Sequence, residues 1–159
     1  MSFKDKKRLI ISFPLEKFPG NEFQKEEWPL HITSVYWFYI PSKNIEAFIT
    51  GLTDYISSID PIATVLGEYT CLGDSMDIPV TLVKNTGILY SIHTEFLQTI
   101  KKHQGILEEP RWCGRNYIPH VTHLNEKVYK LKKLRLDSIA LVEAPDDSDL
   151  RIVSKLFYL

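Results

Sequence analysis

His31-Ile32-Thr33 and His120-Val121-Thr122 are two copies of one pattern: a histidine, a β-branched apolar residue and a threonine. Apolar residues surround both copies, which favours a strand in each case. Residues two apart in a strand point to the same face, so each copy would aim one imidazole and one hydroxyl in the same direction. Two such pairs facing each other would place two titratable nitrogens and two hydroxyl donors around one pocket, a set that suits a phosphate ester.

The residues that flank the two motifs repeat as well. Trp28 and Tyr117 each precede their histidine by three positions, and Pro29 and Pro119 lie just upstream. Proline in a sheet occurs at strand starts or edges, so both histidines should lie early in their strands. The copies are 89 positions apart (120 − 31), which leaves room for one helix–strand unit between them.

At these motifs the chain resembles the two-histidine (2H) phosphoesterase superfamily, also called the 2′-5′ RNA ligase-like family. Its signature is two His-x-Thr/Ser motifs, each on a strand, at roughly this interval. The match falls on both tripeptides, and the order of elements looks similar over nearly the whole chain. The resemblance implies two pseudo-symmetric lobes with an active cleft between them, so that residues 1–159 would form a single two-lobed domain.

The resemblance also implies an activity. The protein would be a metal-independent phosphodiesterase without a cofactor, and its partners would be RNA ends or small nucleotides with a 2′,3′-cyclic phosphate or a 2′-5′ linkage. For ring opening we assign His120 as the base and His31 as the acid, an order that the near symmetry of the motifs does not fix. Thr33 and Thr122 would hold the phosphoryl oxygens. The alternative is an RNA-end or nucleotide-binding module with the same pocket and little turnover. The non-functional interpretation is two unrelated strand histidines, each with a local hydrogen bond.

The rest of the chain predicts strands and helices without regular βαβ alternation. This mixture favours an α+β fold with antiparallel sheets and helices on the outer faces. Helical apolar spacing predicts helices over 42–56 and 87–103. Strands are expected at 8–13, 30–40, 62–72, 79–84, 117–124, 134–143 and 150–158, with a loop over 14–27.

Aromatic and basic residues beside the motifs are candidates for substrate binding. Arg111, Arg115 and Tyr117 precede the second motif, and Tyr36 and Trp37 follow the first. Arginines hold phosphates and aromatic rings stack on bases. A solvated basic loop and core aromatics are an equally weighted interpretation.

Two further features bear on the substrate. Many relatives have an arginine after the second motif where this chain has Leu124-Asn125, so Arg111 or Arg115 would have to replace it. A basic run from Lys127 to Arg135 is either a solvated face or, beside the cleft, a guide for an RNA backbone. Its cationic residues are Lys127, Lys130, Lys132, Lys133 and Arg135.

The remaining histidines give little support for a metal site. His123 follows His120 by three positions, which on a strand puts the two rings on opposite faces. No His-Glu-x-x-His run or aspartate-rich ligand run is present. His93 is expected to be a partly buried structural residue of the second helix.

The composition favours an ordinary globular protein rather than a polyanion-binding or membrane protein. The net charge is −1, and no apolar stretch approaches the length needed to cross a bilayer. The charged start does not have the pattern of a signal peptide. Cys71 and Cys113 form no Cys-x-x-Cys pair, and two free thiols favour a cytoplasmic location.

Overall fold

The structure, a computed structural model, describes residues 3–124, 127, 129, 132–146 and 148–159. The strands are β1 (Lys6–Pro14), β2 (Glu22–Gln24), β3 (His31–Pro41), β4 (Ile62–Leu72), β5 (Ile78–Lys84), β6 (Ile106–Leu107), β7 (His120–Thr122), β8 (Lys133–Leu136), β9 (Ser138–Glu143) and β10 (Leu150–Tyr158). The helices are α1 (Ile45–Ile56) and α2 (Gly87–Lys102), with 3-10 turns η1 (Phe3–Asp5), η2 (Lys25–Glu27), η3 (Ser42–Asn44), η4 (Pro110–Trp112) and η5 (Gly114–Asn116).

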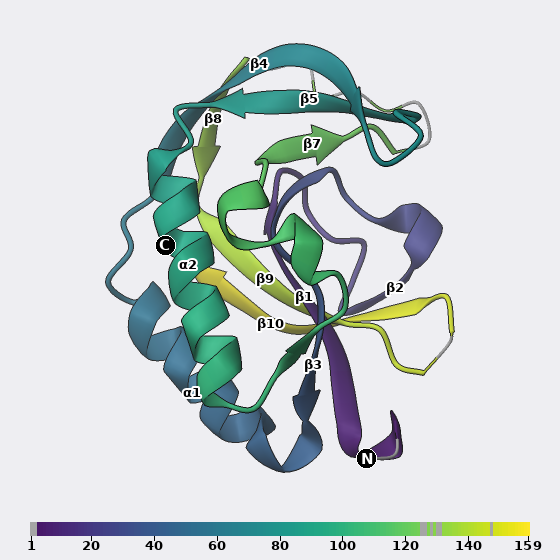
Figure 1. Ribbon diagram of the computed structural model, residues 1–159, viewed down its shortest axis with the longest axis vertical. Coiled ribbons are helices and arrows are strands. Elements are labelled where there is room, and N and C mark those ends of the chain that lie inside the picture. The colour runs from purple at the N-terminus through teal and green to yellow at the C-terminus, as the bar shows by residue number, and fades with distance from the viewer. Residues whose placement is uncertain (1–2, 125–126, 128, 130–131, 147) are drawn as a thin grey trace.

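All the strands belong to one curled sheet, and every pairing in it is antiparallel (Figure 1). The order is β2-β10-β9-β1-β3-β7-β5-β4-β8, with β6 beside β3. The expected α+β class is therefore confirmed. The antiparallel sheets expected in the two lobes form one continuous sheet, because β3 and β7 pair at Ile32 and Val121 and join its two halves.

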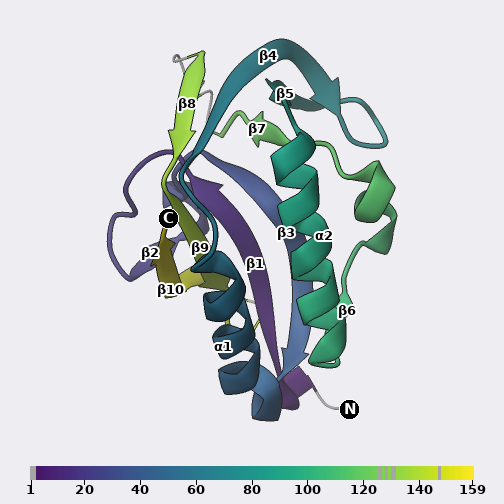
Figure 2. The same ribbon diagram turned by 90° about the vertical axis from the view of Figure 1, so that its left-hand side faces the viewer.

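Both α-helices pack side by side against the same face of the sheet (Figure 2). Their buried residues recur every three or four positions, which gives each helix one apolar stripe. The apolar side chains of both helices pack against alternate residues of the strands. Together they form one core that contains residues from both halves of the sheet. Members of this core include Leu9, Ile11, Phe13, Ile32, Phe38, Phe48, Leu52, Leu66, Ile92, Phe96, Val121, Leu136 and Leu141.

The other face of the sheet carries a smaller apolar cluster. Its members alternate along the strands with those of the main core, as Ile10 does between Leu9 and Ile11. Side chains of the segment between β1 and β3 cover it, among them Trp28. The buried members are Ile10, Phe23, Trp37, Ala140, Val142 and Ala144.

The segment 134–143 differs most from the sequence-based expectation. It was predicted as one strand, but it is divided at the exposed Asp137 into β8 and β9. β8 pairs with β4, whereas β9 pairs with β1 and β10, so the two pieces lie in opposite halves of the sheet. Aspartate is a poor strand former, and the Asp137 carbonyl accepts a hydrogen bond from the Leu159 N–H at 2.9 Å.

The second motif strand is also shorter than expected. β7 spans only three residues, because the chain before it turns through η5 and the Tyr117 N–H bonds to the Gly114 carbonyl at 3.0 Å. The short strands β2 and β6 were not predicted. In the described part of the chain, neither helix is long and apolar enough to cross a bilayer.

Candidate active site

The two His-x-Thr motifs lie on neighbouring strands. Ile32 pairs with Val121, and both are 0% exposed in the main core. The antiparallel register therefore sets each histidine opposite the threonine of the other copy. All four motif side chains alternate with the buried pair, lie on the face away from the helices and are half-buried. The structure thus brings His31, Thr33, His120 and Thr122 together, and their catalytic role stays a prediction.

The two motif histidines have the same local hydrogen bond. Nδ1 of His31 lies 2.8 Å from the Pro29 carbonyl, and Nδ1 of His120 lies 2.6 Å from the Ile118 carbonyl. A carbonyl only accepts, so each Nδ1 carries the proton and donates it. In the neutral ring Nε2 is then the basic nitrogen, and no described residue forms a hydrogen bond with it in either copy. Each ring is consequently oriented and leaves one nitrogen available for proton transfer.

Burial shifts both rings toward their neutral forms. Burial, together with a smaller effect of the charge of His120, lowers the pKa of His31 to about 4, against the opposing effect of the Pro29 carbonyl. Burial also lowers the pKa of His120, against the bond to the Ile118 carbonyl. In the unliganded protein both rings are therefore mostly neutral at pH 7, and protonation of one disfavours protonation of the other.

The aromatic residues of the repeated flanks both support the first motif. The Trp28 ring packs on the His31 ring with centroids 5.2 Å apart. The Tyr117 hydroxyl donates to the Thr33 carbonyl at 2.8 Å. Tyr117 is only 6% exposed, so its expected role in stacking on a base is corrected to one of positioning β3. The matching place of Trp28 in its flank was the signal that it belongs to the site.

His93 connects α2 to β3 and to the loop that precedes β7. Its Nδ1 donates to the Ser34 carbonyl at 2.6 Å, and its Nε2 accepts from the Gly114 N–H at 2.9 Å. The ring stacks on Tyr117 with centroids 4.1 Å apart and an interplanar angle of 13°. Burial lowers the pKa of His93, and both nitrogens are engaged in the neutral ring. The structural role expected for this residue is confirmed.

Trp37 does not fit the expected stacking role. It is 8% exposed and lies in the smaller cluster, on the same face of the sheet as His31 and Thr33. The Arg8 guanidinium covers its ring at 4.2 Å from the centroid, and Trp28 meets it edge-on at 5.9 Å. Trp37 therefore supports the face of the sheet rather than offering a free ring to a base.

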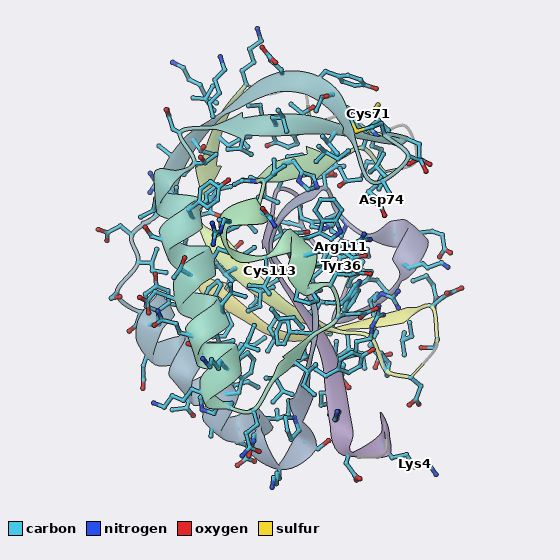
Figure 3. The ribbon with its side chains drawn as sticks, in the orientation of Figure 1. Lys4, Tyr36, Cys71, Asp74, Arg111 and Cys113 are labelled. Carbon is cyan, nitrogen blue, oxygen red and sulfur yellow. The ribbon has the colours of Figure 1, made fainter. Side chains whose placement is uncertain are left out.

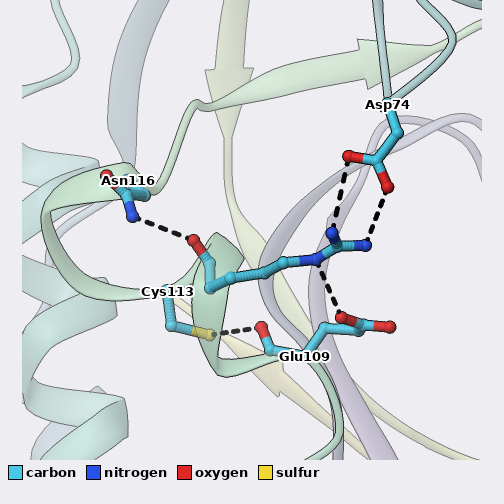
Figure 4. Close-up of polar contacts among 5 residues, drawn as sticks. Asp74, Glu109, Cys113 and Asn116 are labelled. Carbon is cyan, nitrogen blue, oxygen red and sulfur yellow. Dashed lines mark hydrogen bonds and ion pairs between the residues drawn. The ribbon is translucent and has the colours of Figure 1, made fainter.

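Arg111 and Tyr36, both labelled in Figure 3, are accessible to a ligand. Tyr36 is 46% exposed. The Arg111 guanidinium forms ion pairs with Asp74 at 3.1 Å and with Glu109 at 3.1 Å (Figure 4). A phosphate would have to compete with these carboxylates for the guanidinium. Arg115 is exposed in η5.

The part of the basic run that lies on β8 is remote from the motif strands. Lys133 and Arg135 are exposed on β8, which β5 and β4 separate from β7. Lys132 is exposed just before β8, and Lys127 forms an ion pair with Glu16 at 3.3 Å. Lys130 lies outside the described residues.

His123 has partners of its own outside the motif set. Its Nε2 lies 2.8 Å from the Thr81 hydroxyl, and its ring packs on Tyr69 with centroids 4.8 Å apart. Among the described residues, no three His, Cys, Asp or Glu side chains are grouped so as to hold a metal ion. Asn125, expected to stand where relatives carry an arginine, lies outside those residues.

Solved structures share this fold over nearly the whole chain. E. coli LigT complexed with 3′-AMP has a TM-score of 0.68 at 11% identity, covering 97% of this chain and 98% of that chain. A structure described as a phosphoesterase has a TM-score of 0.64 at 12% identity, covering 96% and 98%. The protein TT0787 of Thermus thermophilus has a TM-score of 0.62 at 12% identity, covering 96% and 97%.

The comparisons confirm the expected resemblance at the level of fold. TM-scores of 0.68 and 0.64 over nearly the whole chain establish a shared architecture, whereas identities of 11% and 12% leave the substrate open. No protein-family model matches the sequence, and no curated protein is similar to it.

Proposed function

We propose that the protein is a metal-independent phosphodiesterase that acts on 2′,3′-cyclic phosphate or 2′-5′-linked RNA or nucleotides. The observation that carries the proposal is the matched pair of imidazoles on paired strands, each with Nδ1 bound to a backbone carbonyl and Nε2 available. The fold supports it, since structures of the similar E. coli LigT are complexes with 3′-AMP, NADP+, ATP and phosphate.

The reaction needs one neutral and one protonated imidazole. The base takes a proton from water at Nε2 as the water oxygen attacks phosphorus, and the acid gives its Nε2 proton to the leaving ribose oxygen. Burial is the main cause that lowers the pKa of His31 to about 4, and the shift at His120 is smaller, so His31 is the ring that stays neutral when one proton is shared. This order favours His31 as the base and His120 as the acid, the reverse of the assignment made from the motifs alone.

The two threonines complete the proposed site. Each hydroxyl lies opposite the other copy's histidine in the register, so both can donate to non-bridging phosphate oxygens between the rings. Charge on these oxygens grows in the transition state, and the hydrogen bonds strengthen with it. A bound phosphate anion also raises the pKa of both rings, which favours the protonated acid.

Arg111, Arg115 and Tyr36 are the proposed contacts with the rest of the substrate. All three are exposed, and two of them carry guanidinium groups that suit phosphate oxygens. For Arg111, binding a phosphate would mean giving up its ion pair with Asp74. Tyr36 offers a ring for a base to stack on.

The test is turnover of a 2′,3′-cyclic nucleotide and a 2′-5′ dinucleotide by the purified protein in EDTA. We expect hydrolysis that His31→Ala and His120→Ala each slow on the order of 10² or more and that His123→Gln leaves intact, because His123 bonds elsewhere. Binding without turnover would support the nucleotide-binding alternative. Activity that needs added zinc or manganese would refute the metal-independent mechanism.

A further inference from the structure

A cavity of about 780 Å³ opens at the other end of the sheet face that carries the motif histidines. Its walls come from the start of β1, the end of β3 and the β9–β10 turn, near Lys4 in Figure 3. Five cationic and four acidic side chains line it. The cationic ones are Lys4, Lys6, Lys7, Arg8 and Arg151.

Arg151 has an unusual environment for a charged side chain. It is 9% exposed, and its Nη1 donates to the carbonyls of Ser148 and Leu150, both at 2.9 Å. Its Nε is buried without a hydrogen-bond partner. Burial and the nearby charge of Arg8 lower the pKa of Arg151, against the attraction of the Asp149 and Glu26 carboxylates. A buried guanidinium with an N–H left unbonded is costly, and an anion that accepts from this Nε would offset that cost.

Arg8 brings a second guanidinium to the same place. It forms a two-point ion pair with Glu108, at 2.9 Å for both contacts. Both guanidinium groups face the ring of Trp37, Arg8 at 4.2 Å and Arg151 at 5.4 Å from its centroid. The side chains that line the cavity carry one more positive than negative charge (5 − 4), and both guanidinium groups lie at its wall.

Aromatic rings connect this cavity to the candidate active site. Trp37 meets Trp28 at 5.9 Å between centroids, and Trp28 meets His31 at 5.2 Å. The cationic end and the histidine end are thus three short contacts apart on one face of the sheet. A ligand that reaches from one end to the other needs a negative group at some distance from its reactive phosphate.

We propose that the cavity is an anion subsite that binds a backbone phosphate of a single-stranded oligonucleotide whose reactive end lies at His31 and His120. The proposal rests on the proposed function for the reactive end. It adds that the substrate is an oligonucleotide rather than a mononucleotide. Guanidinium groups bind phosphate oxygens through two parallel hydrogen bonds, which lysines cannot reproduce.

The first test compares a 2′,3′-cyclic mononucleotide with oligonucleotides of increasing length that end in the same cyclic phosphate. We expect kcat/KM to rise with substrate length in the unaltered protein. Arg151→Gln should lower kcat/KM about tenfold for the longer substrates and leave that of the mononucleotide unchanged. The plot of log kcat/KM against log salt should become less steep by about 0.7, the value for one phosphate on a single strand. Lys101→Gln, on the last turn of α2, is the control that removes one charge from the opposite face.

Two further variants distinguish a loss of anion binding at the subsite from a loss of folding. Arg151→Lys keeps the charge but loses the two-point geometry, and Lys6→Gln removes a less buried cation from the cavity wall. Each should fold, as judged by thermal unfolding, and each should lower kcat/KM for the long substrates alone. If kcat/KM does not depend on length, or if these variants affect all substrates equally, the subsite proposal is overturned and the phosphodiesterase stands.

A second measurement covers the case in which no substrate is hydrolysed. The proposed function then fails, and fluorescence anisotropy of a 5′-labelled single strand tests the subsite alone. Weaker binding by Arg151→Lys and Lys6→Gln, with Lys101→Gln unchanged, would support the subsite. Equal binding by all the variants, or competition by inorganic phosphate as effective as that of unlabelled oligonucleotide, would overturn it.

Discussion

The two motif copies have nearly the same sequence and the same hydrogen bond at Nδ1, but their surroundings differ. The first opens a strand of eleven residues in the middle of the sheet, with Trp28 packed on its histidine. The second fills a strand of three residues, which lies behind a loop that His93 and Tyr117 hold. Local sequence therefore sets the orientation of each ring, whereas distant residues hold the second copy in place.

Removing either motif histidine is expected to have the largest effect. His31→Ala and His120→Ala should each lower kcat on the order of 10² or more, because each ring transfers a proton. Steady-state kinetics on a cyclic-phosphate substrate measures this. If one variant retained full activity, the two copies would not be catalytic equals and the acid–base pair would be refuted.

Removing His93 should test whether distant residues hold the second motif copy in place, and the expected effect is on the free energy of unfolding. His93→Ala leaves the Gly114 N–H and the Ser34 carbonyl without their partner and opens a cavity, so the free energy of unfolding should fall by about 2 kcal/mol. Urea unfolding measures the loss, and His103→Ala at the end of α2 is the control. A folded His93→Ala variant that lost all activity while His120→Ala kept it would contradict the assignment of the site.

The threonines should matter less than the histidines and to a similar degree. Thr33→Val and Thr122→Val each remove one neutral hydrogen bond to the phosphate, and kcat should fall about tenfold. Comparing the two variants shows whether both copies hold the phosphoryl group. A loss in KM alone, with kcat unchanged, would mean that the hydroxyls bind the ground state and do not stabilise the transition state.

The pH dependence of stability should show the smallest difference between the copies. The pKa values of His31, His93 and His120 are lowered in the folded protein, so the unfolded chain binds more protons below the ordinary value of 6.5. Stability should therefore be full above pH 6.5 and fall as the pH drops toward the His31 value of about 4. Urea unfolding of His31→Gln and His120→Gln at pH 7, 5.5 and 4.5 should show a flatter profile for each. A steeper profile in either variant would contradict the burial of that ring.

The sequence predicted the parts of the molecule that depend on short-range pattern. The alternation around Ile32 and Val121 was enough to place all four motif side chains on one face. The apolar spacing in α1 and α2 predicted both helices with small errors at their ends. A matched flank also pointed to Trp28 and Tyr117, although not to what they contact.

Features that depend on distant residues could not be predicted. Trp37 and Tyr117 have the composition of base-stacking residues, and only the packed structure shows that both are buried. Arg8 and Arg151 come from opposite ends of the chain, so no spacing links them to one cavity. The division at Asp137 likewise depends on which strand each half pairs with, a choice made by the whole sheet.

β8 has a consequence for how copies of this protein meet in solution. It is an outermost strand of the sheet, so one row of its backbone N–H and C=O groups faces outward, where a second sheet could add on. Lys133 and Arg135 are exposed on this strand and alternate with the buried Leu134 and Leu136. If two β8 edges came together, the basic residues of one would face those of the other. This repulsion between like charges disfavours edge-to-edge aggregation.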